Sequence, residues 1–407
     1  MSFQQGLSGL SAASENLDVI GNNVANANTV GFKTGEATFA DVYAASLSGS
    51  GGSQVGIGTK VTGVVQQFSQ GQITATSNPL DVAINGGGFY RLSTNGTITF
   101  SRNGQFQMDN SGYIVNPTGA RLTGYTANSS GVLNTSAPAE LQISTADRAP
   151  QTTSTVNALL NLDSTQSAPT TSPFSLSDPT TFNSSTSVSV YDSLGNSHVL
   201  STYYVKTAAG SWDVYAALDG TQVGAGAAGT LKFKGDGTID TATTTLPFNL
   251  SANVTTGATS PLSFTLGFAG STQFGSSFSV NALDQNGFAS GRLTGFNISP
   301  DGTIEGRYTN GQTSVLGQII TSNFANPQGL EALGNNAFAE SAASGNPVIG
   351  TPGSGTLGVL QSSAIEDSNV DLTAELVNMI TAQRNYQANA QTIKTQDQVM
   401  QTLVNLR

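Results

Sequence analysis

Residues 370–407 read VDLTAELVNMITAQRNYQANAQTIKTQDQVMQTLVNLR, and the spacing of apolar residues in this stretch decides the fold of the chain ends. Ten positions follow alternating steps of four and three residues, and eight of them are apolar: Leu372, Leu376, Met379, Gln383, Tyr386, Ala390, Ile393, Asp397, Met400 and Val404. This spacing puts side chains on one face of an α-helix, as a coiled-coil seam requires. We expect Ser368 or Asn369 to cap the helix, with Asp371 and Glu375 in its first turns.

The N-terminal end carries a shorter stripe of the same kind. Its members are Phe3, Leu7, Leu10, Leu17 and Val24, with the small residues Ser14 and Gly21 in the two gaps. Two interpretations remain open. The ends form a helical hairpin that closes the core of one monomer, or they form a coiled-coil assembly module. The length and one-sidedness of the helices favour the second interpretation, because a small β domain would not cover them.

Between these ends the chain has the pattern of β-strands. Asn95-Gly96, Asn103-Gly104, Ser111-Gly112 and Thr118-Gly119 recur every seven or eight residues, with short alternating apolar segments between them. Asn-Gly between alternating apolar residues is a strong hairpin signal. Asp301-Gly302 and Asn310-Gly311 flank a similar segment, and a second β block follows Val188.

Composition suggests a nested organisation. Residues 147–186 are rich in Ser, Thr and Pro, which is typical of a crossing between domains, and residues 46–58 have the composition of a flexible loop. The predicted fold is mostly β with helical termini, in which a second β domain is inserted into the first. The expected parts are a terminal helical domain (1–30 and 365–407), a linker region with an extended loop (31–70), a middle β domain (71–146 and 285–364) and an inserted outer β domain (147–284).

Composition also excludes several classes of function. The 407 residues include no Cys and one His, so disulfides, thiolate nucleophiles and multi-His zinc sites are excluded. Only 10% of residues are charged and the formal net charge is −11, which argues against nucleic acid and anionic membranes as partners. No run of about 18 apolar residues predicts a membrane span. Met1 to Leu10 lack the basic and apolar regions of a Sec-type signal peptide.

Candidate chemical sites have simpler structural explanations. The run Asn85-Gly86-Gly87-Gly88-Phe89 lacks the Lys-Ser/Thr and helix of a phosphate loop and is predicted to be a tight turn. His198 has no visible nucleophile partner and is expected to be structural. Asp192, Asp236 and Asp301 lie in glycine-containing turns, where turn chemistry accounts for Asp. We therefore expect no catalytic residue, no cofactor and no metal.

One stretch has a specific family resemblance. Residues 14–34, SENLDVIGNNVANANTVGFKT, resemble the N-terminal signature of the bacterial flagellar rod and hook axial proteins. The matching positions are Ser14, Leu17, Val19, Asn23, Asn26, Asn28, Thr29, Gly31, Phe32 and Lys33. Residues 370–407 are similar to the other end of this family. The length and the block at 147–284 resemble its hook-type members, although the loop at 46–58 falls where distal rod-type members carry an extra segment.

The resemblance implies a structural subunit of a curved, hollow homopolymer that acts as a universal joint between motor and filament. It also implies helical ends that pack as coiled coils around a central channel, and export by the flagellar type III apparatus without a cleaved signal. The implied partners are further copies of the chain, a hook cap protein, the distal rod protein and the hook–filament junction protein. The alternatives are a distal rod-type protein, a secreted β-rich adhesin or carbohydrate-binding protein and, least favoured, an enzyme.

Overall fold

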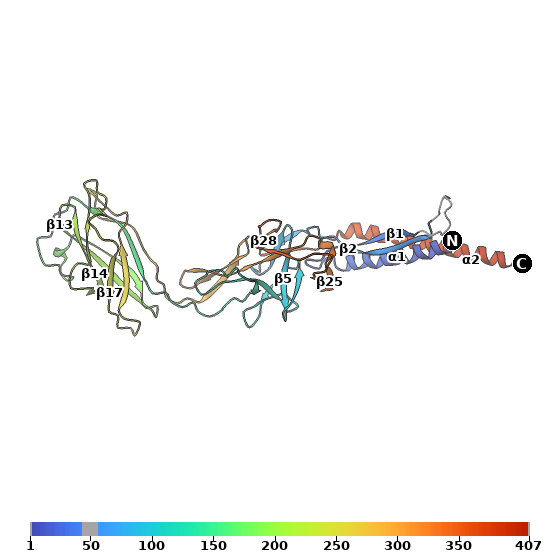
Figure 1. Ribbon diagram of the computed structural model, residues 1–407, viewed down its shortest axis with the longest axis horizontal. Coiled ribbons are helices and arrows are strands. Elements are labelled where there is room, and N and C mark those ends of the chain that lie inside the picture. Colours follow the sequence, from blue (N-terminus) through green and yellow to red (C-terminus); the bar gives the residue numbers. More distant parts are fainter. Residues whose placement is uncertain (1, 43–55, 406–407) are drawn as a thin grey trace. The chain divides into compact units, whose positions relative to one another are not determined.

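The computed structural model describes residues 2–42 and 56–405, and the chain divides into two compact units (Figure 1). Unit 1 comprises Met1–Ser144, Gly295–Arg307 and Thr313–Arg407. Unit 2 comprises Thr145–Thr294 and Tyr308–Gln312, and the block expected to be inserted, 147–284, lies within it. Strands predominate and a helix lies at each end of the chain, which confirms the predicted fold class.

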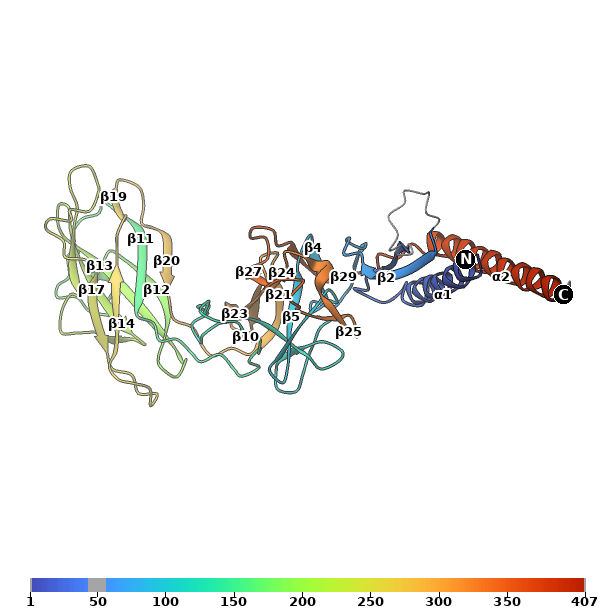
Figure 2. The same ribbon diagram turned by 45° about the vertical axis from the view of Figure 1, so that its right-hand side comes forward.

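The two terminal helices of unit 1 lie side by side. Helix α1 spans Ser2–Ala25 and helix α2 spans Leu372–Asn405. They run antiparallel, and α2 continues past the N-terminal end of α1 (Figures 1 and 2). The cap of α2 is Asp371, whose Oδ1 accepts the backbone N–H groups of Thr373 (2.9 Å) and Ala374 (3.1 Å), so the predicted caps Ser368 and Asn369 were wrong. Within the described residues no helix has both the length and the apolarity to cross a membrane.

The region expected to be a linker, 31–70, contains an antiparallel hairpin. Strands β1 (Gly35–Val42) and β2 (Gly58–Gln66) pair along their length, with an irregularity between Thr38 and Phe39. The hairpin lies along α1, where the Oγ of Ser8 accepts the N–H of Thr59 (3.3 Å). Residues 46–55 of the predicted flexible loop lie outside the described residues.

The rest of unit 1 is a β domain built from both halves of the chain. Its main sheet has the order β21 (Leu293–Ile298), β22 (Thr303–Tyr308), β23 (Thr313–Ile319), β9 (Arg121–Thr126), β5 (Phe89–Thr94), β6 (Thr97–Ser101), β26 (Ala337–Ala339) and β25 (Glu331–Gly334). Shorter strands join it: β7 (Gln107–Met108), β8 (Ile114–Val115), β10 (Ala139–Glu140), β24 (Thr321–Asn323) and β27 (Val348–Gly350). Two separate pairs, β3 (Ile73–Ala75) with β29 (Ala364–Glu366) and β4 (Val82–Asn85) with β28 (Val359–Ser362), join the segments that lead to and from the helices. A 3₁₀ turn covers Pro327–Gly329.

Most of the predicted turns connect paired strands. Asn95-Gly96 joins β5 to β6, with both residues at positive φ (52° and 88°), and Ser111-Gly112 joins β7 to β8. Thr118-Gly119 joins β8 to β9, and Asn310-Gly311 joins β22 to β23. Asn103-Gly104 is different, because β6 pairs with β5 and β26 and not with the next strand along the chain. This turn redirects the chain without closing a hairpin.

Unit 2 contains two sheets that share one apolar core. The first has the order β17 (Phe248–Ala252), β18 (Leu262–Gly267), β11 (Thr155–Asp163) and β19 (Thr272–Phe274), with β20 (Ser279–Gln285) also on β11. The second has the order β12 (Ser184–Tyr191), β13 (Ser197–Ala208), β14 (Ser211–Leu218) and β15 (Thr221–Gln222), with β16 (Gly229–Lys232) also on β14. A 3₁₀ turn covers Pro179–Thr181.

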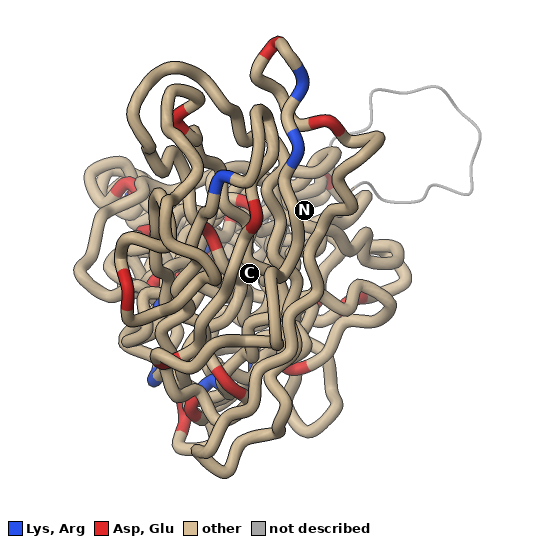
Figure 3. Tube along the Cα trace, turned by 90° about the vertical axis from the view of Figure 1, so that its left-hand side faces the viewer, with Lys and Arg blue, Asp and Glu red and all other residues tan. Residues whose placement is uncertain are grey.

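The core of unit 2 takes side chains from both sheets, including the fully buried Trp212, Tyr204 and Leu160. Strand β11 therefore belongs to this core, although the composition of 147–186 is typical of a crossing between domains. The polar composition arises in part because the alternating strand exposes Thr155 and Asn157 between buried residues. Charged residues are few and scattered along the chain trace in Figure 3.

Candidate assembly surface and its anchoring cluster

A buried ion cluster lies where both helices leave the β domain. Lys33 follows α1, Arg102 follows β6, and Glu366 ends β29. The Nζ of Lys33 lies 2.7 Å from Oε1 of Glu366, and Nη2 of Arg102 lies 2.9 Å from Oε2 of the same glutamate. The side chains of Lys33 and Glu366 are fully buried and that of Arg102 is 4% exposed. We call these three residues the junction cluster.

The backbone around the junction cluster satisfies its remaining polar atoms. Lys33 also donates to the carbonyl of Ser69 (2.7 Å), and Oε1 of Glu366 accepts the N–H of Gly71 (2.9 Å). Burial lowers the pKa of the Lys33 amine and the nearby Arg102 acts in the same direction, whereas Glu366 opposes both. Full pairing is what makes a buried charge tolerable.

The glycine run before β5 completes the cluster. Nη1 of Arg102 donates to the carbonyls of Gly86 (2.9 Å) and Gly88 (2.6 Å). The run therefore presents acceptors to a cation, whereas a phosphate loop presents N–H donors to an anion. It forms a turn between β4 and β5, as predicted.

The signature residues shape the turn that links α1 to the β domain. The Asn23 side chain pairs with the backbone of Gly35 in both directions, donating to its carbonyl (2.8 Å) and accepting its N–H (2.9 Å). Gly31 has a φ of +73°, and its N–H donates to the carbonyl of Glu366 (2.8 Å). A Cβ on Gly31 would lie 2.7 Å from the backbone nitrogen of Asn103. Glycine is required there by both the backbone angle and the close approach.

The other signature residues lie around the same turn or on the exposed face of α1. Asn26, Thr29 and Phe32 are half-buried, and the hydroxyl of Thr29 donates to the Oδ1 of Asn26 (3.1 Å). Ser14 and Asn28 are exposed.

Asn369 ties the approach of α2 to the same region. Its Oδ1 accepts the N–H (2.8 Å) and the hydroxyl (2.7 Å) of Thr34, and its Nδ2 donates to the carbonyl of Gln67 (2.7 Å). The segment before α2 is thus bound to both strands of the β1–β2 hairpin at its open end, where Gly35 pairs with Gln66.

The two helices meet through small residues. A Cβ on Gly6 would lie 3.1 Å from Cγ1 of Ile393, and one on Gly9 would lie 2.9 Å from the Asn389 amide. Ala13, Ile20 and Ala382 are buried. On α1 these contacts lie one position before the predicted stripe. A shift of one residue rotates a helix face by about 100°, so on α1 the apolar stripe flanks the helix–helix contact, whereas on α2 its member Ile393 lies in the contact.

Most of the predicted apolar stripe is therefore left accessible. The exposed members are Phe3, Leu7, Leu372, Leu376, Tyr386, Met400 and Val404. The half-buried members are Leu10, Leu17, Val24, Met379, Ala390 and Ile393. Val377, Ile380 and Val399, which the stripe did not include, are also exposed.

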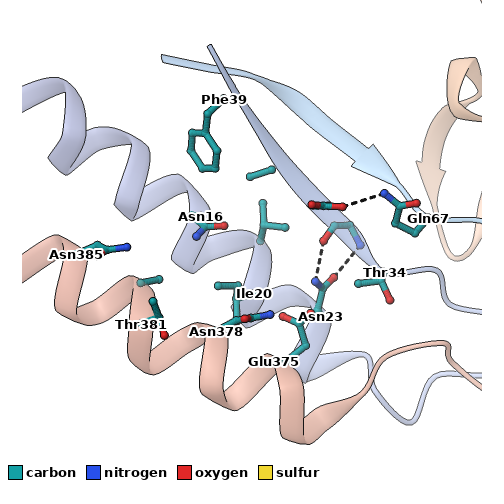
Figure 4. Close-up of a pocket in the computed structure, with 15 residues that line it drawn as sticks. Asn16, Ile20, Asn23, Thr34, Phe39, Gln67, Glu375, Asn378, Thr381 and Asn385 are labelled. Atoms are coloured by element: carbon teal, nitrogen blue, oxygen red, sulfur yellow. Dashed lines mark hydrogen bonds between the residues drawn. The ribbon is translucent and has the colours of Figure 1, made fainter. Parts of the chain in front are cut away.

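A groove of about 520 Å³ runs between α1, α2 and the β1 strand (Figure 4). Asn16 and Ile20 line it from α1, Phe39 from β1, and Asn378 and Asn385 from α2. Glu36 and Glu375 are its charged residues. The groove is thus acidic, with amide and apolar walls.

His198 lies in unit 2 and is buried between two carboxylates. Its Nδ1 lies 2.6 Å from Asp219 Oδ2, and its Nε2 lies 3.3 Å from Asp192 Oδ2. Burial lowers the pKa of His198, but the hydrogen bonds to Asp219 and Asp192 outweigh it and raise the pKa above its ordinary value. Asp192 also accepts the N–H groups of Leu194 and Asn196, which is turn chemistry.

The other two candidate acids have the same explanation. Asp236 accepts the N–H of Thr238 (2.9 Å), and Asp301 accepts the N–H of Thr303 (3.0 Å). Each side chain holds its own turn.

No local pattern in the sequence marks Arg102 or Glu366, and Asn369 was singled out only as a helix cap, although all three anchor the helices. Glu366 is separated from Lys33 by 333 residues and from Arg102 by 264. The low number of charged residues was a usable signal for Arg102 and Glu366, because few charged residues are available to be buried in this chain.

Four family models match the chain and together cover most of it. They are described as "Flagella basal body rod protein" (residues 3–33), "Flagellar hook protein FlgE/F/G D1 domain" (83–157), "Flagellar basal body protein FlaE D2 domain" (161–288) and "Flagellar basal body rod FlgEFG protein C-terminal" (361–406). The matches at the two ends include α1 and α2, and the D2 match lies within unit 2.

Relatives match over the whole length. The chain is 46% identical over 415 residues to the flagellar hook protein FlgE of Salmonella typhimurium, covering 100% of both chains. It is 45% identical to that of Escherichia coli K12, again over 100% of both, and 34% identical to that of Borreliella burgdorferi, over 100% of this chain and 99% of the relative. The crystal structure of Helicobacter pylori flagellar hook protein FlgE2 has a TM-score of 0.55 at 14% identity, covering 72% of this chain and 100% of that one, which shows a shared fold.

Proposed function

The chain belongs to the flagellar hook protein family, and from that membership we propose that it is the structural subunit of a bacterial flagellar hook. In this role, copies assemble into a flexible, curved, hollow tube that transmits motor torque to the filament as a universal joint. The observation that carries the proposal is identity of 46% over the full length of a hook protein. A distal rod-type protein and an adhesin are not favoured, since the full-length relatives are named hook proteins.

The proposed subunit interface is the apolar stripe on the terminal helices. It consists of Phe3, Leu7, Leu10, Leu17, Val24, Leu372, Leu376, Met379, Tyr386, Ala390, Ile393, Met400 and Val404. Its exposure in the single chain supports this role, because large apolar side chains that flank one another in water mark an interaction surface. At roughly 25 cal/mol per Å² of apolar surface, a few hundred Å² of contact per neighbour contributes several kcal/mol. The occupant of this surface is the same surface on further copies of the chain.

The setting follows from the same proposal. The subunit acts outside the cell, in the flagellum and continuous with its basal body, and it leaves the cell through the type III export apparatus without a cleaved Sec signal. Its partners besides further copies are the hook cap protein, the distal rod protein and the hook–filament junction protein. We assign it no enzymatic activity, cofactor, metal, nucleic acid or membrane insertion.

Removal of both terminal helices tests the proposal. A chain lacking residues 1–25 and 372–407 keeps the β domains but loses the stripe, so we expect it to melt cooperatively and to form no tubes after salting out. Electron microscopy of negatively stained samples distinguishes tubes from aggregates, with the full chain as control. Tubes formed by the truncated chain would show that the stripe is not the assembly surface.

A further inference from the structure

The groove between α1, α2 and β1 contains a carboxylate oxygen without a partner. Oε2 of Glu375 is buried, and it accepts no hydrogen bond from any described residue. Glu36, the other acid of the groove, accepts from the side chain of Gln67 (3.0 Å). Figure 4 shows Glu375 beside Asn23 and Asn378, on the wall formed by α2. A buried carboxylate oxygen costs free energy until a donor reaches it, so a donor that reached Glu375 from the groove would stabilise this residue.

The opposite side of α2 presents a matching ridge. Val377, Ile380 and Arg384 follow one another at steps of three and four residues, and all three are exposed. Arg384 is nine residues from Glu375, which places it roughly 180° around the helix. Among the described residues no ion pair or side-chain hydrogen bond of Arg384 is found. One face of α2 thus lines an acidic groove, and the reverse face carries two apolar side chains and a cation.

We propose that the Val377–Ile380–Arg384 ridge of one copy docks in the groove of a second copy, with Arg384 donating to Glu375. The apolar side chains of the ridge would meet Val19, Ile20 and Phe39, which line the groove from α1 and β1. The acidic charge of the groove, its apolar walls and the unpartnered oxygen of Glu375 all favour this ridge as the occupant. The inference rests on the proposed self-assembly and names a contact within it, distinct from the apolar stripe.

The contact is directional. The ridge and the α2 wall of the groove lie on different faces of α2, so each docked copy still offers a free ridge and a free groove. Such heterologous contacts do not pair off into dimers, and they continue into rings or helical filaments. An arginine suits the groove because its guanidinium binds carboxylates with two parallel hydrogen bonds.

Charge reversal tests the pairing. Arg384→Glu places an acid against Glu36 and Glu375, and we expect the protein concentration needed for tube formation to rise on the order of tenfold. Lys394→Glu is the matched control: it makes the same charge change at another exposed position of α2, about 15 Å further along the helix. Its threshold is expected to stay close to that of the unmodified chain. Both variants are checked for the helical signal and melting temperature of the starting protein.

Mixing complementary variants identifies the partner surface. Glu375→Lys and Arg384→Glu each raise the threshold for tube formation when alone, but in an equimolar mixture every ridge finds a groove of opposite charge, so tubes return near the original threshold. Glu36→Lys, at an exposed position of β1, replaces Glu375→Lys if the latter destabilises α2.

The outcomes separate the two proposals. If the unmodified chain forms no tubes, the proposed function fails. If it does form them and Arg384→Glu behaves like Lys394→Glu, or the mixture does not recover, the docking of ridge into groove is overturned while self-assembly stands.

Discussion

At the scale of single residues, the junction cluster is the place where loss of one side chain is expected to reduce the stability of the fold strongly. Two cations and one carboxylate are buried together, and each is satisfied by at least one backbone group in addition to its ion pair. Desolvation makes such a cluster weak evidence for stability, but it makes loss of one member expensive. The cluster joins the segment that follows α1 to the segment that precedes α2, so it fixes where the two helices leave the β domain.

Removing the carboxylate charge exposes this dependence. Glu366→Gln leaves Lys33 and Arg102 buried with no counter-ion, and we expect a loss of about 3–5 kcal/mol in the free energy of unfolding, measured by denaturant titration. The matched control is Glu140→Gln, which removes a partly exposed ion pair to Arg121 at 2.6 Å. Water screens that pair, so its loss should be much smaller. Equal losses for the two variants would contradict the structural role of the cluster.

His198 predicts a pH dependence confined to unit 2. The pKa of His198 is raised by Asp219 and Asp192, so its contribution to stability is fully present below the ordinary value of 6.5 and is lost as pH rises through the folded-state pKa. The pKa values of Asp192 and Asp219 are lowered, so their contribution holds above 3.8 and falls in acid. Melting of the unmodified chain and of His198→Gln should therefore differ most between about pH 4 and 6.5. A difference that stays constant from pH 5.5 to 9 would contradict this.

The contacts of single side chains are also the part of the structure that the sequence predicts least well. The family signature identified Lys33 and Gly31, but the partners of Lys33 come from distant parts of the chain, and pairing between them follows from the fold alone. His198 is buried between Asp192 and Asp219. Its carboxylate partners could not be named, because only the pairing of β12, β13 and β14 brings Asp219 beside the turn at Asp192.

At the scale of elements, the direction of α1 depends on the glycine that follows it. Gly31→Ala adds a methyl group 2.7 Å from a backbone nitrogen at a φ of +73°. Gly96→Ala is the matched control, since its φ is +88° but no atom lies within 4 Å of the added carbon. In denaturant titrations we expect the free energy of unfolding to fall by about 1–2 kcal/mol for the control. We expect a larger fall for Gly31→Ala. A loss at Gly31 no greater than at Gly96 would show that the contact with Asn103 is easily relieved.

The spacing of apolar residues predicted both helices, but it did not predict which face of each helix contacts the other. Gly6, Gly9 and Ala13 form the close contact because they allow the helix backbones to approach, and a search for large apolar residues passes over them. The apolar stripe was the stronger pattern, and it lies beside this contact. A single sequence does not distinguish a face turned to its own partner helix from one turned to another molecule.

The small-residue contact predicts weakly protected helices in the monomer. It buries little apolar surface, so α1 and α2 should open readily in a single chain and become ordered once neighbours cover the stripe. Hydrogen exchange should be fast in both helices of the monomer and slow in the assembled state, with the core strands β13 and β14 protected in both. Helices protected in the monomer as strongly as these strands would contradict the dependence on assembly.

At the scale of the whole molecule, the two units differ in the side chains that they expose. The helices of unit 1 expose a stripe of large apolar side chains, whereas the strands of unit 2 expose many Ser, Thr and Asn residues, as in β12, and a few separate apolar ones such as Val199 and Phe274. A tube that turns while curved requires outer contacts that form and break in every revolution. Polar surfaces exchange direct and water-mediated hydrogen bonds at low cost, and large dry interfaces do not. We therefore expect unit 2 to set curvature and stiffness, and the terminal helices to hold the polymer together.

Deleting unit 2 tests this division of roles, and the structure supplies the place to cut. Arg148 and Gly291 exchange backbone hydrogen bonds (2.8 and 3.3 Å), so the two crossing segments are already paired there. A two-residue Asn-Gly turn in place of residues 149–290 closes such a pair without strain. The shortened chain should still form tubes on salting out, but straight ones or ones of altered curvature, because the apolar stripe is intact and the outer contacts are gone. Electron microscopy beside the full chain measures this, and failure to assemble by a shortened chain whose β domain melts normally would place unit 2 in polymerisation itself.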